Sequence, residues 1–468
     1  MPLLPFPCLG SLAVMLAIAA PALGASLPDA GHFPEAPAHA AAAPAAPAQW
    51  WRAFGDPILD GLVRQGLRAG VGVEEAAARL AQARGRLIAA DATRRPTVSL
   101  DVNTSNQAGP LINALGAEGN LTEASARLSY ELDILGRLSR SRQAARADVR
   151  AGAALLQDAR LLTEADIARA YVSLRAADQE VRLLHDAADS ARATLRITQG
   201  RRQSGFETDL AVSRAEAELG SIQSDALAAE RRRHELEHAL GFLVGDPQLT
   251  VAPAASPAAM AAPPAIPAGI PSEVLARRPD IAAAQADLNA AQLRLGVART
   301  AWLPNLTLTA SGGFASPQLG ELISSSMRSF GLDLLMALPP FDGGRRKSGI
   351  AAAQAELDLA RAHYRRQVLT AFRDVDDQLS ALRLLDEQAA VAARTAAAAD
   401  RALALSSSRR GNGLASELEV LDARRTDLKD RRAQVQVKSA RYLATISLIQ
   451  ALGGGWDATG ASPPQPAD

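Results

Sequence analysis

Hydrophobic and polar residues alternate strictly in four short segments of the chain. In the first, residues 97–103, the apolar side chains share one face and the polar ones the other: Val98, Leu100 and Val102 against Ser99, Asp101 and Asn103. The segments 126–133, 305–311 and 329–336 show the same period of two. This pattern predicts strands with one apolar face, and a length of about nine residues suits a tilted transmembrane strand. A soluble hairpin packed on a helix would produce the same pattern.

Two much longer segments carry apolar residues at a spacing of seven. Between Arg137 and Gln199 no proline occurs, and the seam positions are Ile167, Leu174, Val181, Ala188 and Leu195. Between Arg345 and Ser407 the corresponding positions are Val375, Leu382, Ala389, Ala396 and Leu403. Such heptads predict coiled-coil helices, each roughly 90 Å long at about 1.5 Å per residue. Shorter helices are expected over 72–94, 208–243, 272–301 and 416–452.

The two halves of the chain repeat each other at a fixed offset. Equivalent residues lie 208 positions apart, as in Pro96 and Pro304, Gly136 and Gly344, and Gly205 and Gly413. Each repeat should contain a helix, two strands, a very long helix and a return helix. The predicted divisions are repeat 1 over 49–245 (strands near 97–133), a linker or equatorial segment over 246–271, repeat 2 over 272–453 (strands near 305–338) and a C-terminal tail over 454–468.

The N-terminus has the pattern of an exported protein. An apolar run over residues 9–24 precedes Ala25, which predicts a signal peptide over 1–24 and an Ala- and Pro-rich leader over 25–48. The one cysteine, Cys8, falls within this signal, so the exported chain should carry no disulfide. No later stretch of about 18 apolar residues occurs, so we expect no helix of the exported chain to span a membrane.

Charge and short motifs exclude several classes of function. Lys+Arg and Asp+Glu both number 50, and the zero net charge gives no support for nucleic-acid binding. The segment from His234 to His238 matches the H-E-x-x-H helix of zinc peptidases, but Val244 stands where the longer motif has its third histidine. The sequence has no Gly-rich phosphate loop and no nucleophile elbow. We predict no catalytic residue, cofactor or metal site, with a zinc peptidase as an alternative.

Four strands cannot close a barrel by themselves. Because lipid satisfies no hydrogen bonds of an open sheet edge, strands that span a membrane would require several chains, and three chains would supply twelve strands. The predicted fold class is mostly α with a small transmembrane β part. Two structural repeats with long coiled-coil helices would form a trimeric α-barrel, joined to a shared 12-stranded β-barrel. The alternative is a solvated coiled-coil rod without a lumen.

Acidic residues follow the turn after the second long helix. Glu419 and Asp422 lie on one helix face because they are three residues apart, and Glu417 precedes them. In a trimer each would form a ring of three carboxylates, and such rings select cations. Because the carboxylates repel one another, closure of the ring would depend on hydrogen bonds to neighbouring helices, helped by basic groups such as Arg409 or Arg410. Acids at a helix start also stabilise the helix dipole, which is the simpler interpretation.

Six motifs are spread over residues 49–456. They are Trp51-x-x-Phe54-x-Asp56-Pro57-x-Leu59, Tyr130-Glu131-Leu132-Asp133-Ile134-Leu135-Gly136-Arg137, Arg277-Arg278-Pro279-Asp280-Ile281, Pro340-Phe341-Asp342-Gly343-Gly344-Arg345, Leu418-Glu419-Val420-Leu421-Asp422-Ala423 and Ala451-Leu452-Gly453-Gly454-Gly455-Trp456. Together they resemble the TolC-like outer-membrane efflux factors, in the lipoprotein-type branch paired with resistance-nodulation-division pumps. The resemblance implies a homotrimer in the outer membrane of a Gram-negative bacterium, with its helical tunnel in the periplasm.

The resemblance also implies a passive exit duct of a tripartite efflux system, which carries drugs or other small toxic compounds. The implied partners are a periplasmic adaptor protein, an inner-membrane resistance-nodulation-division pump and outer-membrane lipid. The periplasmic gate would contain Glu417, Glu419 and Asp422. The adaptor would contact two turns, formed by Gly205, Phe206, Glu207, Thr208, Gly413, Leu414, Ala415 and Ser416. A duct of this fold for protein secretion or metal-ion export is the alternative. Because Ala25 stands where many members of the branch carry a lipidated cysteine, we expect no acyl group.

Overall fold

The computed structural model describes residues 49–107, 119–253, 277–316, 322–323, 328–338 and 340–454. The expected signal peptide and leader, most of the expected linker and nearly all of the expected tail lie outside these residues. The domain boundaries given above therefore stay predictions.

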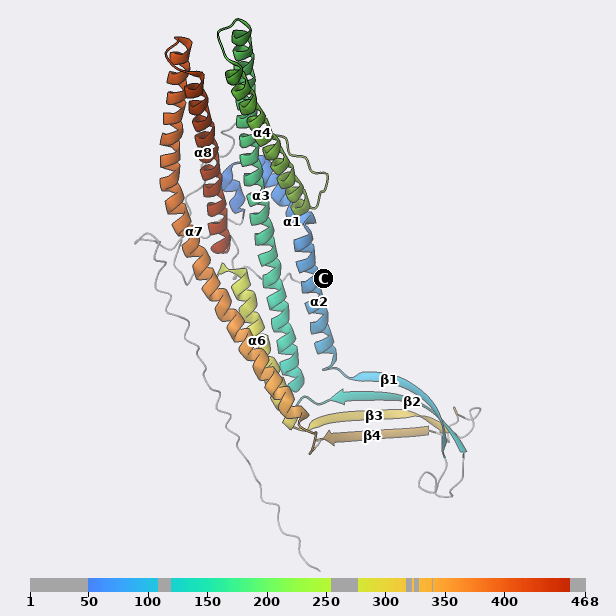
Figure 1. Cartoon of the computed structure of the whole chain (residues 1–468). Helices are drawn as coiled ribbons and strands as arrows, with labels where there is room; N and C mark the ends of the chain where they lie inside the picture. The colour runs from blue at the N-terminus through green and yellow to red at the C-terminus, as the bar shows by residue number, and fades with distance from the viewer. Residues whose placement is uncertain are drawn as a thin grey trace, which may run out of the picture.

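Two long helical hairpins form most of the described structure (Figure 1). The first consists of α3 (Arg137–Gln203) and α4 (Asp209–Val244), and the second of α7 (Arg345–Gly411) and α8 (Glu417–Ala451). Both α3 and α7 contain 67 residues, which makes each about 100 Å long. Helix α8 also packs on α3, so the two hairpins lie side by side. Among the described helices, none is long and apolar enough to cross a membrane.

One shorter helix lies along each long helix (Figure 1). It covers the part of the long helix that the return helix of the hairpin does not reach. Helix α2 (Val71–Ala92) packs on α3, and α6 (Pro279–Arg299) packs on α7. Alanine is the most frequent buried residue of α3, and such small side chains allow close packing of helices. Helix α6 begins with Pro279 in its first turn, where proline is well tolerated. Residues 272–276 of the predicted helix lie outside the described residues.

Four antiparallel strands extend from the end of the helical bundle opposite the hairpin turns (Figure 1). They form one sheet in the order β1 (Thr97–Gln107), β2 (Gly119–Glu131), β3 (Asn305–Ser316) and β4 (Arg328–Ala337). The register places Val98 opposite Leu128, Leu128 opposite Ala310, and Ala310 opposite Leu332. Opposed residues share a face, so the register joins the predicted apolar faces into one. The mostly helical fold with four strands is confirmed.

The second predicted strand, 126–133, begins seven residues later and ends two residues later than β2 does. Strand β2 ends at Glu131 because Asp133 instead caps helix α3. Its carboxylate accepts hydrogen bonds from the backbone N–H of Leu138 at 2.9 Å and of Ser139 at 2.7 Å. A carboxylate at this place satisfies N–H groups that have no partner inside the helix.

A waist of short elements packs around the middle of α3. The η1 turn (Trp50–Phe54) and α1 (Pro57–Ala69) bury Trp50 and Phe54 together with Tyr171 of α3 and Tyr442 of α8. Gly245, which ends α4, has a φ of 73°, and a Cβ there would lie 2.4 Å from the Ala69 carbonyl oxygen. Only glycine therefore fits the close contact between α1 and the end of α4.

Candidate functional site: the hairpin tips and the waist

The two hairpin turns lie at the end of the helical bundle away from the sheet (Figure 1) and are built alike. Gly205 and Gly413 have φ values of 78° and 73°, in the left-handed region. Thr208 and Ser416 then begin α4 and α8 as N-caps, since each hydroxyl accepts a hydrogen bond from a backbone N–H of the following turn. The return helices therefore begin one residue later than the sequence predicted.

Arg410 joins the two turns within one chain. Its Nη2 donates to Glu207 of the first turn, and its Nε donates to Glu417 of α8 at 3.1 Å. All three side chains are at most 23% exposed. The hydrogen bond to Glu417, followed by that to Glu207, raises the pKa of Arg410. Charge-assisted hydrogen bonds of this kind are about twice as strong as neutral ones.

The three acids of the predicted gate occupy different surroundings. Glu417 is held by Arg410, while Glu419 is exposed and lies 3.8 Å from the Arg409 guanidinium. Asp422 is also exposed. The structure therefore brings both expected arginines to the acids: Arg409 lies near Glu419, and Arg410 binds Glu417 of its own hairpin as well as Glu207 of the first hairpin. The pairing of Glu207 with Arg410 was not anticipated from the sequence.

Further arginines of α8 continue this contact toward the waist. The Arg425 Nε donates to Glu218 of α4 at 2.6 Å, and Arg432 donates to Glu180 of α3 at 2.6 Å and to Asp225 of α4 at 3.1 Å. The second hairpin thus supplies arginines, and the first hairpin supplies the carboxylates. Arg424 adds a hydrogen bond to the hydroxyl of a threonine on α3.

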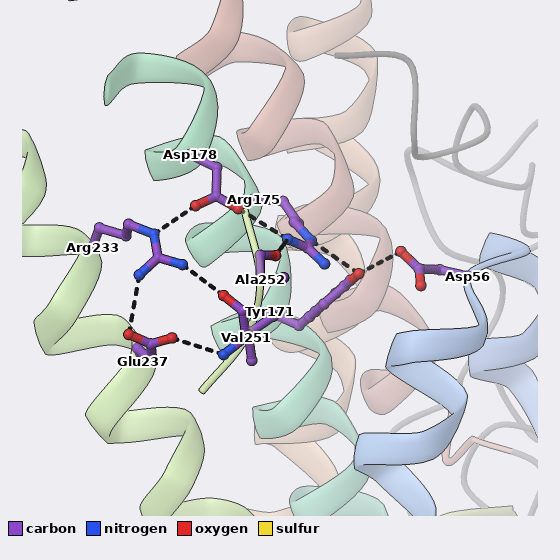
Figure 2. A network of polar contacts seen from close by, with 8 residues as sticks. All are labelled: Asp56, Tyr171, Arg175, Asp178, Arg233, Glu237, Val251 and Ala252. Atoms are coloured by element: carbon purple, nitrogen blue, oxygen red, sulfur yellow. Dashed lines mark hydrogen bonds and ion pairs between the residues drawn. The ribbon is translucent and has the colours of Figure 1, made fainter. Parts of the chain in front are cut away.

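At the waist, Arg175 of α3 lies at the centre of a buried polar network (Figure 2). Its Nε donates to the Tyr171 hydroxyl at 3.0 Å, and its Nη1 donates to Asp178 at 3.0 Å and to the Ala252 carbonyl at 2.8 Å. The Tyr171 hydroxyl donates in turn to Asp56 at 2.5 Å. Burial, with the bond to Asp56, raises the pKa of Tyr171. Arg175 therefore ties the N-terminal segment and residue 252 to α3.

A second arginine completes this network from α4 (Figure 2). Arg233 donates to Asp178 at 2.8 Å, to Glu237 at 3.0 Å and to the Val251 carbonyl at 2.7 Å. Glu237 accepts from the Val251 N–H at 2.8 Å. The side chains of Asp178 and Glu237 are 1% and 9% exposed. Arg175, which is buried, and Arg233, which is 12% exposed, thus balance two buried carboxylates, the condition under which burial of charge is tolerated.

Comparison with known proteins identifies the family. The family described as Outer membrane efflux protein matches residues 71–246 and 270–454. The chain belongs to this family. The Pyoverdine export outer membrane protein OpmQ of Pseudomonas aeruginosa is 31% identical over 418 residues, which cover 87% of each chain. The Antibiotic efflux pump outer membrane protein ArpC of Pseudomonas putida is 29% identical over 451 residues, which cover 92% of this chain and 90% of ArpC.

Solved structures of related channels share the fold of this efflux protein. The outer membrane protein VceC of Vibrio cholerae matches with a TM-score of 0.80 and 26% identity, over 88% of this chain and 99% of VceC. These matches confirm an outer-membrane efflux channel of Gram-negative bacteria, which is not an enzyme. They also confirm the resemblance to TolC-like proteins.

The H-E-x-x-H segment belongs to the waist of the efflux protein. Glu237 binds Arg233 and the backbone of Val251, while Glu235 pairs with Arg231 at 2.7 Å. Within the described ranges, no three His, Cys, Asp or Glu side chains gather so that they could hold a metal ion. Membership of a channel family excludes the zinc-peptidase alternative.

Glu164 of α3 should make the stability of the efflux protein depend on pH. Burial raises the pKa of its carboxyl to about 7 from 4.5, although the Trp50 indole N–H, which donates to it at 2.9 Å, acts in the opposite direction. The folded state therefore holds the proton more tightly than the unfolded state. The resulting stability is full below about pH 4.5 and is lost as the pH rises through about 7.

We expect Glu164→Gln to be more stable than the wild type at pH 8 and equally stable at pH 4.5. The gain should be about 2 kcal/mol after a discount for partial exposure, since the amide oxygen still accepts from Trp50 without ionising. Chemical unfolding in detergent at both pH values measures it. Glu75→Gln, at an exposed ion pair on α2, is the control. A gain at Glu164 that does not change with pH contradicts the prediction.

Proposed function

We propose that the efflux protein forms a trimer with one twelve-stranded barrel and one helical tunnel, and that it is the passive exit duct of a tripartite efflux system. The observation that carries this proposal is the open sheet. Among the described strands, β1 and β4 each pair with one neighbour only. Because lipid offers no hydrogen-bond partners, the β4 edge of one copy has to pair with the β1 edge of the next. Three copies close such a barrel.

Exposed apolar residues on α7 support the same assembly. Leu384, Val391 and Leu405 are 53%, 51% and 65% exposed, and their spacings are multiples of seven. Helix α3 has the same length but buries many more residues. A heptad stripe is the pattern of a coiled-coil seam. A neighbouring copy would cover this stripe.

Purified in detergent, the protein should have the mass of three chains. The open strand edges and the uncovered stripe on α7 are the physical reasons. Light scattering coupled to size-exclusion chromatography measures the mass of the protein without the bound detergent. A monomer, or recovery of the protein in the soluble periplasmic fraction, would contradict the proposal.

We place the periplasmic gate at the second tip. Glu419 and Asp422 are exposed in the single chain, so a trimer would gather two carboxylates from each copy at its mouth. Their mutual repulsion favours an open mouth, whereas Arg410 holds the second turn on the first through Glu207 and Glu417. We infer that Arg410 stabilises the closed mouth and that the carboxylate rings make it select cations.

The tip turns have the surface expected of an adaptor contact. Phe206 and Leu210 are 81% and 60% exposed beside the first turn, and Leu414 and Leu418 are 68% and 55% exposed beside the second. Grouped apolar residues at the end of a charged helical tube mark an interaction surface. We propose that the periplasmic adaptor binds both turns, with Phe206 and Leu414 as its main contacts.

Combining Phe206→Ser with Leu414→Ser should weaken adaptor binding by about 100-fold, because each buried apolar contact contributes about 1.4 kcal/mol or more. Surface plasmon resonance with the adaptor of the same efflux system measures the affinity. The trimer mass should stay unchanged. Leu227→Ser, which alters an exposed apolar residue in the middle of α4, is the matched control. If the double variant binds the adaptor with unchanged affinity, the adaptor does not bind at these turns.

The cargo we propose is a small organic molecule. OpmQ and ArpC are named for the export of pyoverdine and of antibiotics. Deletion of the gene should sensitise the bacterium to antibiotics or other organic compounds, and the wild-type gene should restore resistance. Sensitivity confined to metal ions would favour metal-ion export. Loss of a secreted protein without any sensitivity would favour protein secretion.

A further inference from the structure

The four connections between strands and helices meet at one end of the sheet. We call this side, where each strand joins a helix, the helix-side edge, to distinguish it from the edge strands β1 and β4. Because the strands are antiparallel, β1 and β3 begin at the edge where β2 and β4 end. The described residues of these connections are 93–96, 132–136, 303–304, 338 and 340–344. Figure 1 shows them together at the end of the helical tube. In an outer-membrane protein whose helices lie in the periplasm, this edge is at the periplasmic surface of the bilayer.

Four basic residues belong to the helix ends at this helix-side edge. Arg95 follows α2, Arg299 ends α6, and Arg345 and Lys347 begin α7. All four are exposed. Within the part of the chain that the structure describes, none of their side chains makes a hydrogen bond or an ion pair. We call these four residues the basic collar.

The acids at the same edge do not neutralise the collar, because each is engaged elsewhere. Their partners are Arg142 for Asp91, Arg137 for Glu131, the first turn of α3 for Asp133, and Arg346 for Asp342. Asp342 also accepts from two backbone N–H groups at 3.0 Å, and these bonds hold its pKa below the usual range. The collar therefore carries uncompensated positive charge.

Large apolar and aromatic side chains lie beside the collar. Trp302 is 54% exposed, Phe341 is 86% exposed and Ile134 is 69% exposed. The Arg346 guanidinium lies 4.3 Å from the centroid of the Trp302 ring. Aromatic residues beside basic ones are typical of the boundary between water and hydrocarbon. The edge combines charge for a headgroup with apolar surface for the start of the acyl chains.

The sequence beyond the opposite ends of the strands has no comparable charge. Residues 108–118 and 317–327 contain neither lysine nor arginine, and Arg328 is the first basic residue after them in the second case. Positive charge is therefore concentrated at one end of the sheet, whereas Arg328, which begins β4, is the basic residue of the described strands at the other end. Anionic lipid surfaces attract basic residues by about 1 kcal/mol each near the surface, or about five-fold in affinity.

We propose that the basic collar binds the phosphate groups of anionic phospholipids at the periplasmic surface of the outer membrane, and that Trp302 and Phe341 fix the depth of the sheet in the bilayer. The occupant is a lipid headgroup, because the apolar side chains lie beside the charges and the edge lies at the membrane surface. The proposal does not depend on the cargo of the duct.

Lipid retention by the purified full chain tests the proposal. The protein in detergent is mixed with equal amounts of phosphatidylglycerol and phosphatidylcholine of matched acyl chains, and the retained lipids are counted by native mass spectrometry. We expect the wild type to retain phosphatidylglycerol at least about ten-fold over phosphatidylcholine. The variant Arg95→Gln, Arg299→Gln, Arg345→Gln, Lys347→Gln should retain both equally.

Two further variants separate the collar from general effects of charge. The first variant removes four exposed arginines near the hairpin turns, far from the collar, and should keep the preference. Its changes are Arg196→Gln, Arg214→Gln, Arg394→Gln and Arg401→Gln. The second, Arg95→Lys with Arg299→Lys and Arg345→Lys, keeps the charge and should keep the preference as well. Loss of preference in either variant overturns the proposal.

Other outcomes would also overturn it. The wild type could show no preference, or the collar variant could retain it. Displacement of the lipid by millimolar inorganic phosphate would indicate a site for free phosphate. Dissociation of the collar variant into single chains in both lipids would show that the four residues pair with acids of a neighbouring copy.

Discussion

Replacing Arg175 with methionine should lower the free energy of unfolding of the efflux protein by about 3 to 5 kcal/mol. The side chain of Asp178 is 1% exposed and pairs with two arginines in Figure 2, Arg175 and Arg233. The substitution removes the first of these two pairs. The Ala252 carbonyl and the Tyr171 hydroxyl would each lose a donor. A methionine fills much of the space of the arginine stem but donates nothing. Chemical unfolding in detergent, followed by the helical circular-dichroism signal, measures the loss.

Two controls distinguish this network from an ordinary ion pair. Arg192→Met removes the partner of Asp189 on the same helix, where the side chains are 50% and 74% exposed, and should cost less than about 1 kcal/mol. The double variant Arg175→Met with Asp178→Leu leaves Arg233 balanced by Glu237. It should therefore be more stable than Arg175→Met alone. Equal losses at Arg175 and Arg192 would show that the waist network contributes no more than a surface pair.

The periodicity of the sequence predicts the helices and strands because it is a local property. Gly136 and Gly344, singled out by the repeat, have φ values of 71° and 89° and immediately precede the two long helices. The ends of elements are less predictable, since they depend on single side chains. Asp133 continues the alternating pattern of β2, yet its carboxylate caps α3. The alternating pattern does not show this competition.

The side-chain networks are not predictable from the sequence because their members are far apart in it. Asp56 and Tyr171 are separated by 115 residues, and Glu207 and Arg410 by 203. From the sequence we predicted that Glu207 lies in a tip turn and that Arg410 helps to close the gate. No sequence pattern indicated that these two residues form a pair. At the waist, the H-E-x-x-H pattern indicated zinc chemistry, whereas Glu237 anchors residue 251. Such pairings depend on how the hairpins pack.

Replacing Arg410 with alanine should open the periplasmic mouth and raise the single-channel conductance in a planar bilayer several-fold. The change removes two charge-assisted hydrogen bonds, to Glu207 and Glu417, which join the second turn to the first. With a discount for their partial exposure, the closed state should lose about 2 kcal/mol per chain. That loss changes the ratio of closed to open turns about 30-fold per chain. Loss of the bond also leaves Glu417 free to repel the carboxylates of neighbouring copies.

Matched variants separate the effect of the Arg410 hydrogen bonds on closure from the cation selectivity of the periplasmic gate. Arg394→Ala, which removes an exposed arginine on the same helix without a described partner, should leave the conductance at the wild-type value. Arg410→Lys should give an intermediate conductance, since an ammonium group lacks the planar fork that reaches both carboxylates. Glu419→Ala with Asp422→Ala should instead weaken the cation preference, seen as a shift of the reversal potential in a salt gradient. If Arg410→Ala leaves the conductance unchanged, the closed mouth depends on contacts between copies, and the bond to Glu207 only shapes the tip of each chain.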